Sequence, residues 1–145
     1  MTQNSLGHTR KYLYESGHMF REFKSKIMVC GVPLIHITSG ICPETGRRIW
    51  ARGVIAVGRK AVGVLAIGQL SIGIIAIGQL SIALTFAIAQ LSIAGFFSVG
   101  QLAAGFVAIG QLSTGYYVLG QLAWGKYVFS TTSRDFEAVT FFRGL

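Results

Sequence analysis

The chain has 145 residues, of which 52% are hydrophobic and 12% charged, and its formal net charge is +8. A chain of this length is expected to form one domain. Only five residues are acidic, and residues 61–125 contain no Asp, Glu, Lys or Arg. This distribution excludes an acidic, DNA-mimicking surface and offers no close carboxylate pair for acid–base catalysis.

Residues 1–26 are expected to form a basic N-terminal arm. Its cations that could contact an anionic surface are Arg10, Lys11, Arg21, Lys24 and Lys26, and they are interleaved with Tyr and Phe. Such a pattern is typical of a solvated, partly helical arm that packs on the domain, of an anionic lipid contact, or of a nucleic-acid contact. No apolar stretch typical of a signal peptide is present, so the cytoplasm or the inner face of a membrane is the expected location.

Residues 27–52 are expected to form strands around a turn, because Pro43 and Gly46 bracket the sequence PETG. This segment would act as an N-terminal β cap over the first coil of the repeat. It contains Cys30, His36 and Cys42, but zinc needs about four ligands and no fourth is evident. We therefore expect no metal, two buried and unreactive thiols, and a histidine satisfied within the core.

Residues 53–129 repeat every ten residues, and each ten divides into two fives of the form Gly-x-Leu/Ile-Ala/Ser-Ile/Val. A helix explains this period poorly, because five residues advance a helix by about 140° beyond one turn and the glycines would share no face. Short strands joined at glycine corners explain it directly, since each coil of a β-solenoid hydrogen-bonds to the next at about 4.8 Å. Glycine would supply unusual φ values or close backbone approach at those corners. The sequence therefore predicts an all-β solenoid.

A small integral membrane protein of glycine-rich helices is the alternative. Uncharged runs of eighteen or more residues usually indicate spanning helices. Here, however, the helices would need loops without charge. They would also place polar side chains at every depth, namely Gln69, Gln79, Gln90, Gln101, Gln111 and Gln121.

The unit Gly-Gln-Leu-Ser-Ile resembles the pentapeptide-repeat motif, which has a small residue, a polar residue, Leu, a small polar residue and a free position. The resemblance implies a square, right-handed coil of twenty residues; a two-sided coil of ten residues is equally compatible with the sequence. The stretch SKIMVCGVPLIHITSGICPETGRR followed by RGVIAVG is similar to the opening of an uncharacterised bacterial family with Gly-rich hydrophobic repeats and no established activity.

The resemblance to the pentapeptide-repeat motif also implies which positions face inward. The inward column would be Leu65, Leu70, Ile75, Leu80, Leu91, Phe97, Leu102, Val107, Leu112, Tyr117 and Leu122. The outward apolar surface would contain Ile67, Ile72, Ile77, Ile82, Ile88, Ile93, Phe96, Phe106 and Tyr116. In the alternative registration Leu and Ile both face inward and Ser and Ala cover the outside. We favour the registration with Leu inside and Ile outside, because a tight coil has little room for two bulky residues in every five.

The glutamines recur at one position of the repeat and could stack into an amide ladder. Two repeats carry one extra residue each, in ALTF at residues 83–86 and in AGFF at residues 94–97. These insertions fall on opposite sides of a twenty-residue coil but stack directly in a ten-residue coil. They are either absorbed insertions or bulges that mark a contact point.

Residues 130–145 are expected to form a C-terminal cap with a short helix. Ser133 is the candidate N-cap, and Asp135 and Glu137 suit the first turn. Phe136 and Phe141 would let the helix lie over the last coil. Capping elements of this kind keep solenoids soluble and finite.

Together these features predict a non-enzymatic structural protein, without catalytic residues, cofactor or small-molecule substrate. The repeat serines have no neighbouring His or Lys in sequence, and no phosphate-binding loop is complete. A large uncharged apolar exterior predicts self-association into an oligomer or filament, or docking to a partner or an anionic membrane. Nucleic-acid binding through the basic arm is the third, less favoured hypothesis.

Overall fold

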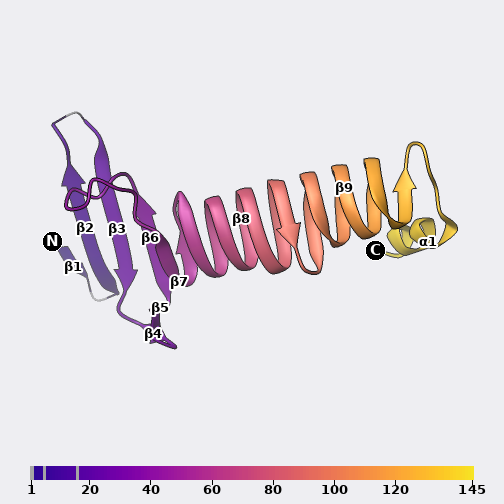
Figure 1. Ribbon diagram of the computed structural model, residues 1–145. Coiled ribbons are helices and arrows are strands. Elements are labelled where there is room, and N and C mark those ends of the chain that lie inside the picture. Colours follow the sequence, from indigo (N-terminus) through magenta and orange to yellow (C-terminus); the bar gives the residue numbers. More distant parts are fainter. Residues whose placement is uncertain (1, 5, 16) are drawn as a thin grey trace. The chain divides into compact units, whose positions relative to one another are not determined.

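The computed structural model describes residues 2–4, 6–15 and 17–145, and it consists of two compact units, Met1–Ile74 and Ile75–Leu145. The fold is the predicted one. It is mostly β, with antiparallel strands in the N-terminal part, a β-solenoid, and one C-terminal helix of nine residues (Figure 1).

The first unit contains a sheet that changes from antiparallel to parallel pairing. Strands β1, β2, β3 and β6 pair antiparallel, whereas β6, β7 and the start of β8 pair in parallel. Their bounds are β1 Thr2–Asn4, β2 Gly7–Leu13, β3 Met19–Ser25, β6 Ile35–Ser39, β7 Ala51–Val57 and β8 Lys60–Ala94. The expectation of a partly helical arm is therefore wrong for Gly7–Leu13 and Met19–Ser25, which are strands. In β3, buried Phe20 and Glu22 alternate with more exposed neighbours, which is the period of a strand.

A small hairpin of β4 (Met28–Val29) and β5 (Val32–Pro33) forms a separate two-stranded sheet. The turn between these strands has positive φ at both central residues, 51° at Cys30 and 81° at Gly31. This is the conformation of the tight hairpin turns that match strand twist.

The predicted reversal at PETG is present. The Gly46 N–H donates to the Cys42 carbonyl and the Cys42 N–H donates to the Arg47 carbonyl, each at 2.9 Å. Just before it, Gly40 has a φ of 87°, and a Cβ there would overlap the Met19 carbonyl oxygen. Only glycine fits at this position.

Each coil of the first unit contains ten residues, because Ala51 pairs with Ala61 and Ala56 with Ala66. All four alanine side chains are fully buried and form one cluster. The two-sided coil is therefore the one observed, and the twenty-residue square coil implied by the pentapeptide resemblance is not.

The second unit continues β8 and adds β9 (Phe97–Ser130), with a register of eleven residues where 86–93 pair with 97–104. Its interior is again made of small side chains. The residues buried at about every fifth position are Ala76, Ser81, Ala87, Ser92, Ser98, Ala103, Ala108, Ser113 and Val118. The predicted inward column is wrong: Ile75, Leu102 and Leu122 are exposed, and only Val107 of that column is buried. A turn of ten residues has room for one small side chain in every five, so Leu and Ile both lie outside.

The buried serines satisfy their hydroxyl groups inside the coil. Ser98 donates to the Ser92 carbonyl at 2.9 Å, and the two hydroxyl oxygens are 2.7 Å apart. Ser113 donates to the Leu119 carbonyl at 3.3 Å. A buried hydroxyl without such a partner would be costly, so these bonds explain why serine can replace alanine in the interior.

The repeat glycines are required for close approach between coils. In the second unit a Cβ on Gly115 would overlap the carbonyl oxygen of Gly105. None of the described repeat glycines has positive φ. Of the two reasons expected for glycine, backbone proximity is the one observed.

The two segments that carry an extra residue, 83–86 and 94–97, meet in register at their last residues. Phe86 pairs with Phe97, and their rings are parallel with centroids 5.2 Å apart. This is the arrangement expected for a two-sided coil.

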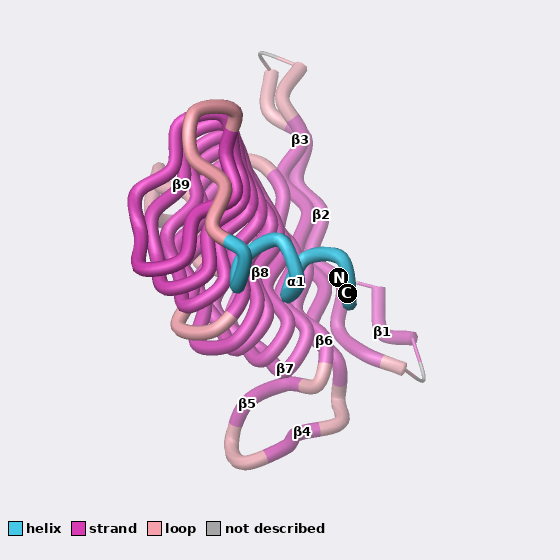
Figure 2. The backbone as a smooth tube through the Cα atoms, turned by 90° about the vertical axis from the view of Figure 1, so that its right-hand side faces the viewer, coloured by secondary structure: helices cyan, strands magenta, loops and turns pink. Residues whose placement is uncertain are grey.

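Helix α1 (Phe136–Gly144) covers the end of β9 (Figure 2). Its N-cap is Asp135 rather than Ser133, because Ser133 is held in a turn by hydrogen bonds with Ser130. The Asp135 carboxylate instead accepts the Val128 N–H at 2.8 Å and ties the helix to β9. Phe141 stacks on Tyr117 at 4.3 Å, as expected, whereas Phe136 is 83% exposed, contrary to expectation.

Candidate functional site

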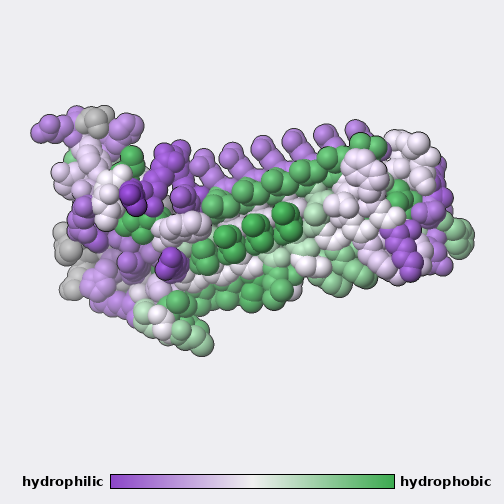
Figure 3. Space-filling model, viewed as in Figure 1, coloured by the Kyte–Doolittle hydropathy of each residue, from purple (hydrophilic) through white to green (hydrophobic). Residues whose placement is uncertain are grey.

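The predicted outward apolar residues lie on the surface of the coils (Figure 3). Most of them are exposed, and Ile72 and Tyr116 are half-buried. The exposed ones are Ile67, Ile77, Ile82, Ile88, Ile93, Phe96 and Phe106. Each coil has two long sides, which we call its walls. Because one coil takes ten or eleven residues, residues about five apart lie on opposite walls. The apolar surface of each unit therefore covers both walls.

Three aromatic rings form a continuous stack on the second unit, which we name the aromatic edge: Phe96, Phe106 and Tyr116. The centroids are 5.9 Å apart in the first pair and 5.0 Å in the second, with nearly parallel rings. Lys126 Nζ donates to the Tyr116 hydroxyl at 3.1 Å and lies 5.0 Å from its ring centroid. The edge thus combines an apolar stack with one cation, as amphipathic aromatic side chains do at a lipid interface.

The glutamines are all exposed, namely Gln69, Gln79, Gln90, Gln101, Gln111 and Gln121. In the described part of the chain, no hydrogen bond joins one glutamine side chain to the next. In the second unit Gln101, Gln111 and Gln121 border a shallow groove of about 460 Å³ whose other border is Val99, Ile109 and Leu119. The coils of residues 75–130 therefore carry a polar row beside an apolar row (Figure 3).

The predicted basic residues do not form one patch. Arg10 and Lys24 lie in strand register with Glu22 and His36 on one face, whereas Lys11 pairs directly with Arg21 on the other. Arg10 is ion-paired with Glu22 and Glu44. Two pairs of the predicted set each line a cavity: Lys24 and Lys26 beside the β4–β5 hairpin, and Arg10 and Lys11 beside Pro43.

A buried acidic and histidine pair lies below that cavity, and the sequence analysis missed its acidic member. Glu22 is 2% exposed, and its Oε1 is 3.1 Å from His36 Nε2 and 2.9 Å from Lys24 Nζ. The Arg52 N–H donates to His36 Nδ1 at 2.9 Å, so Nε2 carries the proton donated to Glu22. His36 is thus a satisfied core histidine, as predicted. The alternation of buried and exposed residues along MFREFKS could have placed Glu22 inside.

The pKa of Glu22 reflects opposing causes. Burial alone raises the pKa of the carboxyl, but the hydrogen bond and positive charge of Lys24, with a smaller effect of His36, bring it below its usual range. The carboxylate is therefore held ionised and neutralises the cations around it.

The other residues considered for chemistry do not come together. Both thiols were expected to be buried, but only Cys42 is; Cys30 lies exposed in the β4–β5 turn, and neither cysteine is in a disulfide. Among the residues that the structure describes, no three His, Cys, Asp or Glu side chains are grouped so that they could hold a metal ion.

The uncharged repeat is built of strands where the membrane-helix alternative needs helices. Within residues 2–4, 6–15 and 17–145, no helix has the length and apolar character that crossing a membrane requires.

The fold and these surfaces define a β-solenoid repeat protein with small residues inside and aliphatic residues outside. Comparison with family models, with curated proteins and with solved structures finds no match to this chain.

Proposed function

We propose that this protein is a non-enzymatic interaction protein that associates with an anionic membrane through the apolar exterior of its solenoid. The observation that carries the proposal is the exposure of the outward side chains in the second unit. On its coils, eleven large apolar residues are more than a third exposed: Ile75, Ile77, Ile82, Leu84, Ile88, Ile93, Phe96, Leu102, Phe106, Leu122 and Trp124. The in-register coils place exposed apolar side chains in rows along the solenoid (Figure 3). A soluble monomer rarely exposes a contiguous apolar patch above a few hundred Å².

Lipid accounts for this surface better than a single protein partner. The exposed side chains lie on both walls and on the aromatic edge, so one flat partner would leave most of them in water. Acyl chains can cover all of these faces. The backbone groups of the coils are already paired between turns, which is the condition for contact with hydrocarbon.

The charge distribution supports an anionic surface. Residues 1–60 contain ten Lys and Arg against three Glu, and residues 61–125 contain no charge. Anionic lipid attracts basic residues near its surface by about 1 kcal/mol each.

Co-flotation with vesicles tests the proposal. We expect binding to vesicles of phosphatidylcholine with phosphatidylglycerol and weaker binding to phosphatidylcholine alone. Phe96→Glu with Phe106→Glu should remove most of the binding, because two charges enter the apolar edge. Gln101→Glu with Gln111→Glu adds the same charge five residues further along and should retain binding. Equal loss in both pairs, or no binding by the native chain, would contradict the proposal.

Self-association is the second candidate, and the in-register rows of aliphatic side chains on the walls favour it, because flat sheets pack face to face. Light scattering of the same samples separates the two candidates. A concentration-dependent oligomer that ignores vesicles would favour self-association, whereas a monomer that binds vesicles would favour lipid.

A further inference from the structure

A cavity of about 710 Å³ lies in the first unit beside the β4–β5 hairpin. Its size is that of sites for small ligands. Three basic residues line it, Lys24, Lys26 and Arg52, together with apolar side chains that include Met28, Ile49 and Trp50. A positively charged wall next to an apolar wall suits an anion that carries an apolar body.

The cations that line this cavity are not balanced by neighbouring carboxylates. Lys24 is paired with buried Glu22, and that carboxylate is already shared with Arg10 and His36. In the part of the chain that the structure describes, Lys26 and Arg52 have no carboxylate within ion-pair distance, and both are exposed. An anionic group bound between them would supply the missing charge.

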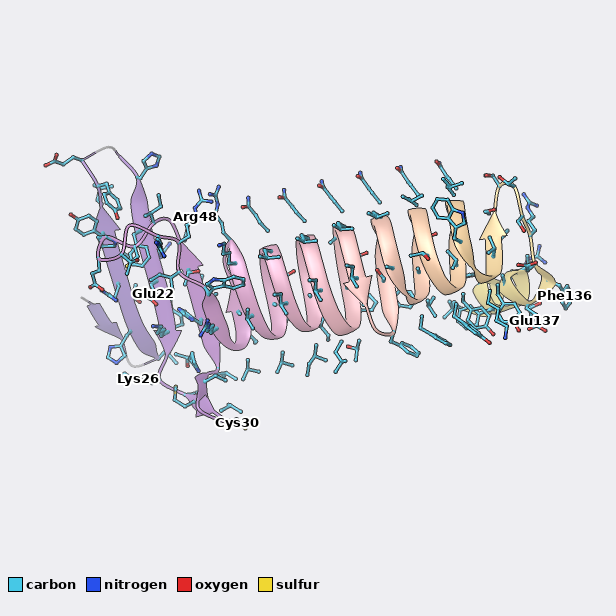
Figure 4. All side chains as sticks on the ribbon, in the orientation of Figure 1. Glu22, Lys26, Cys30, Arg48, Phe136 and Glu137 are labelled. Atoms are coloured by element: carbon cyan, nitrogen blue, oxygen red, sulfur yellow. The ribbon has the colours of Figure 1, made fainter. Side chains whose placement is uncertain are left out.

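The hairpin next to the cavity exposes apolar side chains. Ile27 and Met28 are each 58% exposed, Val29 40% and Val32 39%, and Lys26 immediately precedes them. Figure 4 shows Cys30 at the tip of this projection and Lys26 near its base. A water-soluble anion would leave this tip in water. A membrane lipid accounts for both parts, because its headgroup is anionic and its acyl layer is apolar.

We propose that this cavity binds the phosphate of an anionic lipid headgroup between Lys26 and Arg52, with the β4–β5 hairpin inserted into the acyl layer. Lys24 completes the basic wall, and Trp50 contacts the apolar part of the lipid. The site lies wholly within the first unit, and it rests on the proposed function only in requiring an anionic membrane.

Vesicle binding by two matched pairs of variants tests the site. Lys26→Gln with Arg52→Gln should weaken binding to phosphatidylglycerol vesicles about thirty-fold, the effect of two basic residues at a lipid surface. Lys11→Gln with Arg21→Gln removes the same charge from the other face of the sheet and should weaken binding only a few-fold. Equal effects of the two pairs would overturn the site while leaving membrane association standing.

Fluorescence of Trp50 tests the site without a membrane. The chain has two tryptophans, so Trp124→Phe leaves Trp50 as the single reporter. Monomeric short-chain phosphatidylglycerol should shift its emission in a saturable manner, and Lys26→Gln with Arg52→Gln should abolish the shift. Saturation by inorganic phosphate alone would assign the site to a free anion and overturn the lipid assignment, as would no response. A response to short-chain lipid without vesicle binding would support the site and contradict the proposed function.

Discussion

Substituting Ala108 by Leu is the most direct perturbation of the solenoid's interior. Ala108 is fully buried in a cluster with Ala103 and Val118. Leucine would add three carbon atoms between two backbone walls, and no described cavity borders this position. Inserting extra methylene groups into a packed core costs typically 1–3 kcal/mol and sometimes more. Because the walls are main chain held by coil-to-coil hydrogen bonds, we expect a loss of about 3 kcal/mol in the free energy of unfolding.

The control substitution is Leu112→Ala, four residues further along the same coil. Leu112 is half-buried on the outer wall, so its truncation should cost about 1 kcal/mol, well below the 2–5 kcal/mol of a fully buried leucine. Urea unfolding followed by circular dichroism measures both values. If Leu112→Ala costs more than Ala108→Leu, the leucines face inward and the observed registration is wrong.

Two further changes test other parts of the molecule. Asp135→Ala removes the carboxylate that accepts the Val128 N–H and should lower the free energy of local unfolding at the helix by about 1.5–3 kcal/mol. Hydrogen exchange should therefore speed up in Phe136–Gly144. Unchanged exchange there would refute the role of this contact. Glu22 has a lowered pKa, so its stabilising effect is complete above the unfolded pKa of about 4.3 and is lost as the pH falls through the folded value. Glu22→Gln should therefore weaken the fall of the urea midpoint below about pH 4.3, and an identical pH profile in both proteins would contradict this assignment.

The period of the repeat was sufficient to predict the solenoid and the exposure of most fifth-position isoleucines, such as Ile77 and Ile88. It did not determine which side chains fill the interior. Strict alternation within Leu-Ser-Ile allows either Leu and Ile or Ser to face inward. The pentapeptide resemblance suggested a wide coil with leucine inside. A coil of ten residues is narrower, so its interior position takes a small side chain, as at Ala66 and Ser113, and nothing larger than Val118.

The N-terminal unit was less predictable, because its site depends on pairing between distant strands. Lys24 and Lys26 were recognised as basic residues of one segment. Their association with Arg52 and Trp50 follows from the parallel pairing of β6 with β7, where His36 pairs with Ala56. No local pattern specifies that register. The alternation along MFREFKS indicates the inner face for Glu22, but its full burial depends on β3 lying between β2 and β6.

Contact between the solenoid and acyl chains can be measured directly at Trp124, which is 57% exposed on the coils of the second unit. In a Trp50→Phe variant it is the single tryptophan. With phosphatidylglycerol vesicles whose acyl chains are brominated, we expect a blue shift and strong quenching of its emission. Unquenched emission at saturating lipid would contradict the assignment of the apolar exterior to the membrane.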